Sequence, residues 1–233
     1  MGYDVSFHPI SPDEIQEWHF TPLTWIQQGQ EEKVLALAMQ HGIEDFYAEK
    51  YLDTLRVGAE TEPDELFDKS HGFYIAVIQG FFRDYYYTRG SAFSFLAEEK
   101  PEYARYFTPW AQVVPTALPN PAKNQIIENY CSGVYLSPNQ VLQILRDLEQ
   151  EPKVLEDLEK HWSDGQFAVL KKALTAAAEL GTGLLEATEV VEPNPLHPNE
   201  STCYSNLFHC DRDGVYLYID MAMKQIAQAM EQN

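Results

Sequence analysis

The stretch that decides the fold is "MGYDVSFHPISPDEIQEW", residues 1–18. Apolar and polar residues alternate from position 3 to position 8, which is the pattern of a half-buried strand. Ser11 is a preferred helix N-cap, Pro12 suits the first helical position, and Glu14 can return a hydrogen bond to the cap. The stretch therefore predicts a strand that leads directly into a helix.

The same device recurs at "CSGVYLSPNQVLQILRDL", residues 131–148, where Ser137 is the expected cap and Gln140 its return partner. An apolar stripe follows it at helical spacing. Two such strand–Ser-Pro–helix units are either related halves or a repeated use of a good helix start. Their similarity is too short to establish a duplication.

The rest of the chain predicts more helix than strand. Residues 72–90 favour a central buried helix, with a strand–turn alternative because of their β-branched and aromatic content. We expect further helices over 31–42, 43–58, 137–150, 152–162, 164–181 and 221–230, and strands over 182–191, 202–210 and 215–220. The last two strands would form a C-terminal hairpin through an Asp-Gly turn at 211–214. The fold class is α+β, helix-rich with a small mixed or antiparallel sheet.

The 233 residues suit one domain, 1–233, and the proline-rich segment 109–122 is the best candidate for an internal boundary. Sixteen Lys and Arg against 36 Asp and Glu give a net charge of −20, which disfavours binding to nucleic acid or to an anionic membrane surface. The charge serves solubility or attracts a basic protein partner. Three cysteines, no secretory signal and no apolar span predict a cytoplasmic protein.

The densest polar chemistry lies between residues 189 and 209, around a proline-stiffened loop. Metal binding is not expected, because adjacent His209 and Cys210 would point to opposite faces of a strand, and Cys203 and Cys210 are seven residues apart. No cofactor motif occurs in the chain. A hydrolase remains the alternative function, and its candidate catalytic residues are Glu189, Glu192, His197, Ser201 and His209. It requires at least two of these side chains, or one of them and Cys203, within hydrogen-bond distance.

Tyrosine and tryptophan are more abundant than a core of this size requires, so some rings are expected at a binding surface. The candidate binding residues are Arg83, Tyr85, Tyr86, Tyr87, Arg89 and Trp110. In a third alternative, a ligand sensor, Arg83 or Arg89 would point inward beside the three tyrosines to clamp an anion.

The segments "MGYDVSFHPIS" and "GVYLSPNQVLQIL" resemble small bacterial cytoplasmic proteins, some of them immunity proteins of toxin systems and others YfbM-like domains of unknown function. The resemblance covers about a tenth of the chain and carries over no catalytic residue. It implies an acidic, single-chain binding protein. The leading hypothesis is thus a non-catalytic module that binds a protein partner.

Overall fold

The computed structural model describes residues 3–62, 67–114 and 125–231. A five-stranded mixed sheet lies at its centre, in the order β3-β4-β1-β2-β7. β1 is antiparallel to both of its neighbours, β3 is antiparallel to β4, and β7 is parallel to β2. The strands are β1 (Asp4–Ile10), β2 (Tyr85–Arg89), β3 (Ser132–Leu136), β4 (Gly183–Thr188) and β7 (Cys210–Asp211). The predicted α+β class with a mixed sheet is confirmed.

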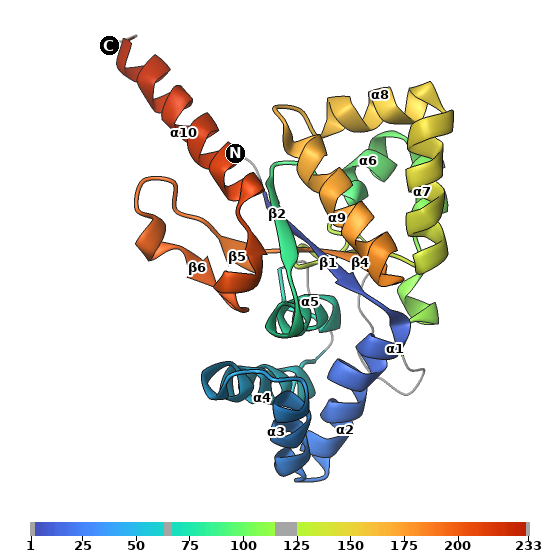
Figure 1. The fold of residues 1–233 in the computed structure, drawn as a ribbon, viewed down its shortest axis with the longest axis vertical. Helices are drawn as coiled ribbons and strands as arrows, with labels where there is room; N and C mark the ends of the chain where they lie inside the picture. The colour runs from blue at the N-terminus through green and yellow to red at the C-terminus, as the bar shows by residue number, and fades with distance from the viewer. Residues whose placement is uncertain (1–2, 63–66, 115–124, 232–233) are drawn as a thin grey trace.

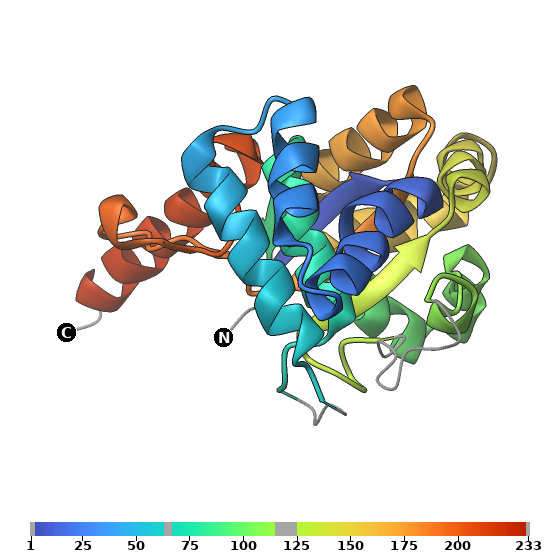
Figure 2. The same ribbon diagram turned by 90° about the horizontal axis from the view of Figure 1, so that it is seen from below.

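Helices cover both faces of this sheet (Figures 1 and 2). One core cluster packs the N-terminal helices on one face, which are α1 (Pro12–Ile15), α2 (Thr21–Gln27), α3 (Glu31–Gln40), α4 (Asp45–Ala59) and α5 (His71–Phe82). A second cluster packs the opposite face against α6 (Phe93–Glu99), α7 (Pro138–Gln150), α8 (Pro152–His161) and α9 (Gln166–Leu180). None of the described helices has the length and apolar character that spanning a membrane requires.

Both predicted Ser-Pro helix starts form capping boxes. The backbone N–H of Ser11 donates to Glu14 Oε2 at 2.8 Å, and that of Ser137 donates to Gln140 Oε1 at 2.8 Å. β1 and β3 flank β4, and both pair at their ends with its first residues, Ile10 with Gly183 and Leu136 with Leu184. The two helices then leave toward opposite faces of the sheet.

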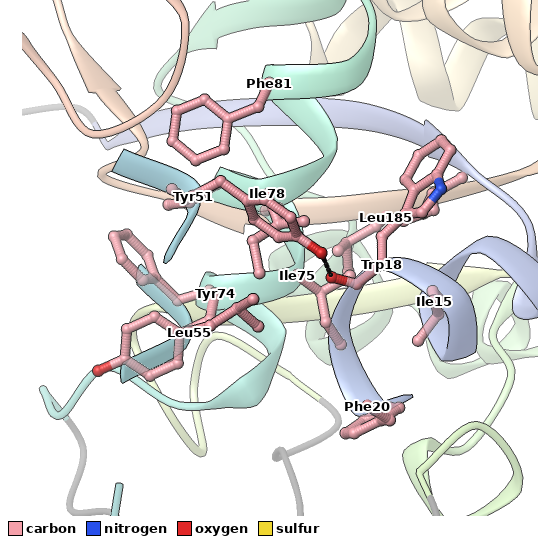
Figure 3. Packing of buried hydrophobic residues seen from close by; sticks show 14 of the residues in the cluster. Ile15, Trp18, Phe20, Tyr51, Leu55, Tyr74, Ile75, Ile78, Phe81 and Leu185 are labelled. Atoms are coloured by element: carbon pink, nitrogen blue, oxygen red, sulfur yellow. Dashed lines mark hydrogen bonds between the residues drawn. The ribbon is translucent and has the colours of Figure 1, made fainter. Parts of the chain in front are cut away.

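The first of these helices is interrupted by a π-helical segment, Gln16–Phe20, before it continues as α2. Pro22 has no N–H to donate to the carbonyl of Trp18, four residues earlier. The hydroxyl of Tyr51 on α4 donates to that carbonyl instead, at 2.7 Å, as the dashed line in Figure 3 shows. This bond ties α4 to the irregular turn inside the first core cluster.

The segment 72–90 contains both the helix and the strand that were predicted as alternatives. The helix α5 ends at Phe82, and the strand β2 follows it. The expected hairpin over 202–220 is wrong: residues 215–220 belong to the helix α10 (Asp213–Glu231), which extends away from the body (Figure 1). Gly214 serves close packing there, since a Cβ on it would lie 1.7 Å from the carbonyl oxygen of Tyr87. The antiparallel pair in this region is β5 (Val191–Glu192) with β6 (Thr202–Cys203).

The candidate boundary at 109–122 lies outside the described residues from position 115 onward. In its described part, Trp110–Gln112 forms a short 3₁₀ turn with Trp110 buried.

Candidate binding site

Glu192, His197 and Ser201 lie in β5 and in the loop that leads to β6. Glu189 lies just before β5, and His209 ends the 3₁₀ turn Leu207–His209 after β6. The hydroxyl of Ser201 donates to Pro198 O at 2.7 Å and accepts from Asn194 N–H at 3.0 Å. His209 Nδ1 lies 2.9 Å from Gly80 O, and the His197 side chain is exposed.

Glu189 and Glu192 lie close enough to interact electrostatically, but they do not form a hydrogen-bonded pair of catalytic carboxylates. Glu189 has a φ of 59°, and its backbone N–H donates to Asp4 O at 3.0 Å. Burial raises the pKa of Glu192, and the negative charge of Glu189 raises it further. No hydrogen bond joins any two of the six described side chains that the hydrolase alternative requires, Glu189, Glu192, His197, Ser201, Cys203 and His209. The convergence on which that alternative depends is therefore absent.

The predicted binding rings do not form a surface. Tyr85, Tyr86, Tyr87 and Trp110 are all buried. β2 has neighbours on both sides in the sheet and is covered on both faces, so all three consecutive tyrosines contribute to the core. The expectation of exposed tyrosine and tryptophan contacts at these positions is corrected.

The two predicted binding arginines are each neutralised within the chain. Arg83 forms an ion pair with Glu14 and lies 4.9 Å from the Trp18 ring. Arg89 forms an ion pair with Asp4. The ligand-sensor alternative needs one of them facing an anion beside the tyrosines, but both guanidinium groups are already occupied by carboxylates.

The three cysteines are free thiols. Burial raises the pKa of Cys131 and of Cys210 to about 12, so neither is a ready thiolate. Within the described parts of the chain, no three His, Cys, Asp or Glu side chains gather in a way that could hold a metal ion.

The segment Cys203–His209, which we call the docked segment, lies against α5. Ser205 Oγ donates to Val77 O at 2.6 Å, beside the His209 contact with Gly80 O. The approach requires glycine at position 80, because a Cβ there would lie 2.3 Å from Ser205 Oγ. Together with α4, the docked segment borders two cavities.

The first cavity, of about 360 Å³, lies at the N-terminal end of α4. Its walls include Glu44, Tyr47, Phe208 and His209. The ring of Phe46 lies 5.1 Å from that of Tyr47 and is 63% exposed, and Phe208 is 80% exposed. We call Glu44, Asp45, Phe46, Glu49 and Phe208 the docking face.

The second cavity, of about 330 Å³, lies further along α4 and has mostly apolar walls. Phe73, Tyr74 and Val77 come from α5, and Cys203 and Tyr204 from the docked segment. Two cations, Lys50 and Lys69, line the same space. We call it the lysine groove.

Sequence patterns alone did not indicate either cavity. The available signal was small: on α4, Phe46 and Val57 lie exposed among polar residues and off its buried side. The docked segment itself was interpreted as a strand, which would have directed its side chains differently.

No protein-family model, no curated protein and no solved structure matches this chain.

Proposed function

We propose that the protein is a non-catalytic binding module of the bacterial cytoplasm, of the immunity or regulator type, that recognises a basic protein partner. The observation that supports it is the docking face, where two largely exposed phenylalanine rings lie among carboxylates. Exposed aromatic rings are costly to hydrate and are frequent anchors of protein interfaces.

The two rings come from elements that are far apart in the sequence, and the fold places both beside the cavity at the start of α4. Phe46 contacts Tyr47, and Tyr47 lines the same cavity as Phe208. A partner side chain that enters this cavity would contact both α4 and the docked segment. Such a paired contact resembles the anchored centre of an interface more than two scattered surface residues do.

Around the rings, three carboxylates outnumber one cation, Lys50, whose ammonium lies 5.2 Å from the Phe46 ring centroid, so the local charge favours a cationic partner. Glu44, Asp45 and Glu49 are exposed at this end of α4. The net charge of −20 adds a long-range attraction for basic proteins and a repulsion for polyanions. The encounter rate with a basic partner should therefore fall as ionic strength rises.

The free thiols support the cytoplasmic assignment. None of the three described cysteines is paired, although Cys203 and Cys210 both lie near the buried ring of Tyr85. A reducing compartment keeps such thiols unpaired.

The test is affinity capture from a lysate of the native host at low salt, followed by binding measurements with each captured protein after purification. A double variant, Phe46→Ser with Phe208→Ser, should weaken binding of the true partner by at least about a hundredfold, as the loss of two anchors of about 1.5 kcal/mol each predicts. The matched control is Phe67→Ser, because Phe67 is equally exposed, at 72%, but lies outside the docking face.

The proposal requires that Phe67→Ser bind as the wild type does and that the association rate fall with added salt. It is overturned if no captured protein distinguishes the double variant from the control, or if association is insensitive to salt. Thermal unfolding of each variant establishes that the loss is not a loss of fold.

A further inference from the structure

The lysine groove has features that a protein-docking surface does not require. Its cavity of about 330 Å³ falls in the range of small-molecule sites, which are concave, largely apolar and equipped with a few polar groups. Its apolar walls come from α5 and the docked segment, and Lys50, Thr54 and Val57 of α4 close the other side.

Lys69 is held among aromatic rings. Its ammonium nitrogen lies 3.6 Å from the ring centroid of Tyr204 and 4.9 Å from that of Phe73. The two rings contact each other edge to face, with centroids 5.5 Å apart. Cation–π contacts of this kind hold the ammonium in place while it keeps its charge.

Lys50 supplies a second positive charge from the facing wall. Its ammonium lies 5.2 Å from the ring centroid of Phe46. Lys50 lines the same cavity as Cys203 and Tyr204 of the docked segment.

Neither lysine forms an ion pair with a described carboxylate. The carboxylate that lines the groove, Asp53, is engaged by Arg56 at 2.7 Å. Other cations of the chain, such as Arg56, Arg89 and Lys172, are held by carboxylates. Two cations therefore line the groove against one carboxylate, and that carboxylate already has a partner.

We propose that the lysine groove binds a small organic anion with an aromatic body, such as an aryl carboxylate or sulfonate. The anionic group would lie between the ammonium groups of Lys50 and Lys69, and the ring would pack on Phe73, Tyr74 and Val77. Both parts are needed, because the lysines alone would hold a solvated anion only weakly and the apolar walls alone would not select charge. This inference does not depend on the protein partner proposed above.

The test compares two fluorescent probes of nearly the same shape, 8-anilinonaphthalene-1-sulfonate and its uncharged analogue N-phenyl-1-naphthylamine. The sulfonate should bind at one site, and the variants Lys50→Met and Lys69→Met should each raise its Kd by about tenfold, the effect of one charge-assisted contact. The uncharged analogue should bind the wild type at least about tenfold more weakly and should not respond to the lysine variants.

The matched control is Lys33→Met. Lys33 also lies over an aromatic ring, with its nitrogen 5.9 Å from the Trp25 centroid, but it lines a different cavity. The proposal is overturned if the sulfonate binds both groove variants as tightly as the wild type, if Lys33→Met weakens it equally, or if the uncharged probe binds as well as the sulfonate. If the probe binds as expected but no captured protein distinguishes the Phe46→Ser, Phe208→Ser variant, the docking face alone is contradicted. If such a partner is found but the probe does not bind as expected, the groove alone is contradicted.

A further variant tests the groove without changing the charge of the protein. Tyr204→Leu removes the ring that lies closest to the Lys69 ammonium while it preserves an apolar wall. It should weaken the sulfonate by about threefold, and 4-phenylbutyrate should displace the probe from the wild type in competition. Failure of 4-phenylbutyrate to displace the probe would contradict a site for aryl anions.

Discussion

The two faces of the sheet bury ionisable side chains of opposite kinds. On the α5 face, His8, His19 and His71 are buried. On the α6 face, Glu186 of β4 is fully buried. Burial disfavours the charged form of any group, so it depresses the pKa of the histidines and raises that of the carboxyl. The same physical cause therefore gives the two faces opposite responses to pH.

His8 is satisfied as a neutral ring. His8 Nδ1 lies 2.7 Å from Gln79 Oε1, and its Nε2 lies 2.8 Å from Ser6 Oγ. The amide nitrogen of Gln79 donates to Asp84 O, which leaves its oxygen to accept a hydrogen bond from the Nδ1–H of His8. Burial lowers the pKa of His8 to about 3 and that of His71 to about 4.

Glu186 is satisfied as an acceptor. Its carboxyl oxygens receive the backbone N–H of Phe93 at 2.6 Å and the hydroxyl of Ser94 at 3.2 Å, where α6 begins. Burial raises the pKa of Glu186 to about 7, while these donors oppose the rise. The comparison shows that α5 is anchored to the sheet by the neutral ring of His8, and α6 by a carboxyl that is close to its titration point at neutral pH.

The largest expected effect comes from removing the α6 anchor. Glu186→Ala leaves the N–H groups of Phe93 and Ser94 and the Ser94 hydroxyl without their acceptor in the core. Buried donors without partners cost about 1–3 kcal/mol each, so we expect the free energy of unfolding to fall by about 4 kcal/mol. Urea denaturation at pH 6 measures it.

Two further variants serve as controls for the loss of stability in Glu186→Ala. Glu186→Gln keeps one acceptor oxygen and should lose only about half as much. Glu200→Ala, on the exposed loop before β6, should lose less than about 0.5 kcal/mol. A loss below about 1 kcal/mol for Glu186→Ala would show that α6 does not depend on this carboxyl.

The next effect is a loss of stability as pH rises from 4.5 to about 7. The pKa of Glu186 is about 7 in the folded protein, against 4.5 when exposed, so its contribution is complete below pH 4.5 and is lost as pH rises through 7. The difference corresponds to about 3 kcal/mol. Unfolding free energies measured from pH 4.5 to 8 should show this decline in the wild type, and Glu186→Gln should flatten it. An equal decline in Glu186→Gln would assign the effect to another group.

The α5 face should respond in the opposite direction and over a lower range. Because the pKa of His8 is depressed from 6.5 to about 3, its contribution is complete above pH 6.5 and is lost as pH falls toward 3. His8→Gln should reduce the loss between pH 6 and pH 4 by about 2 kcal/mol, one proton's share over that interval.

The exposed His197 provides the control, and His197→Gln should leave the acid slope as it is in the wild type. If both variants lose stability with the same slope as pH falls, the protonation of His8 does not contribute to the loss of stability in acid. The acid limit would then belong to His19 and His71, whose pKa values burial also lowers.

Features of the fold could be predicted from the sequence where the interacting residues lie close together along the chain, and not where they lie far apart. The two helix starts at Ser11 and Ser137 are local, since cap and return partner lie three residues apart, and both were predicted. The close packing at Gly214 was not predicted, because an Asp-Gly pair before an aromatic run is typical of a hairpin. Only the carbonyl of Tyr87, distant in the sequence, reveals why glycine is required there.

The candidate site was harder for the same reason. Tyr85, Tyr86 and Tyr87 suggested surplus rings, yet a strand covered on both faces needs large side chains on both. Lys50 and Lys69 are distant in the sequence, and they line one groove only because the fold brings them together with Tyr204. No spacing rule connects these positions, so neither groove nor docking face could be predicted from periodicity.

The smallest effect tests whether the two faces are independent. Ser11→Ala and Ser137→Ala each remove a helix cap, and each should cost about 1 kcal/mol. Their strands lie on either side of β4, about 10 Å apart by the usual strand spacing, and their helices pack in different core clusters. The losses should therefore add, so that the double variant loses about 2 kcal/mol.

Denaturant melts of the two single variants and the double variant complete the cycle. A coupling energy below about 0.5 kcal/mol means that each Ser-Pro unit stabilises its own face of the sheet. A coupling above about 1 kcal/mol would instead mean that strain at one helix start is transmitted through β4 to the other. In that case the histidine and carboxyl anchors would also be coupled, and the acid and alkaline losses could not be separated by single variants.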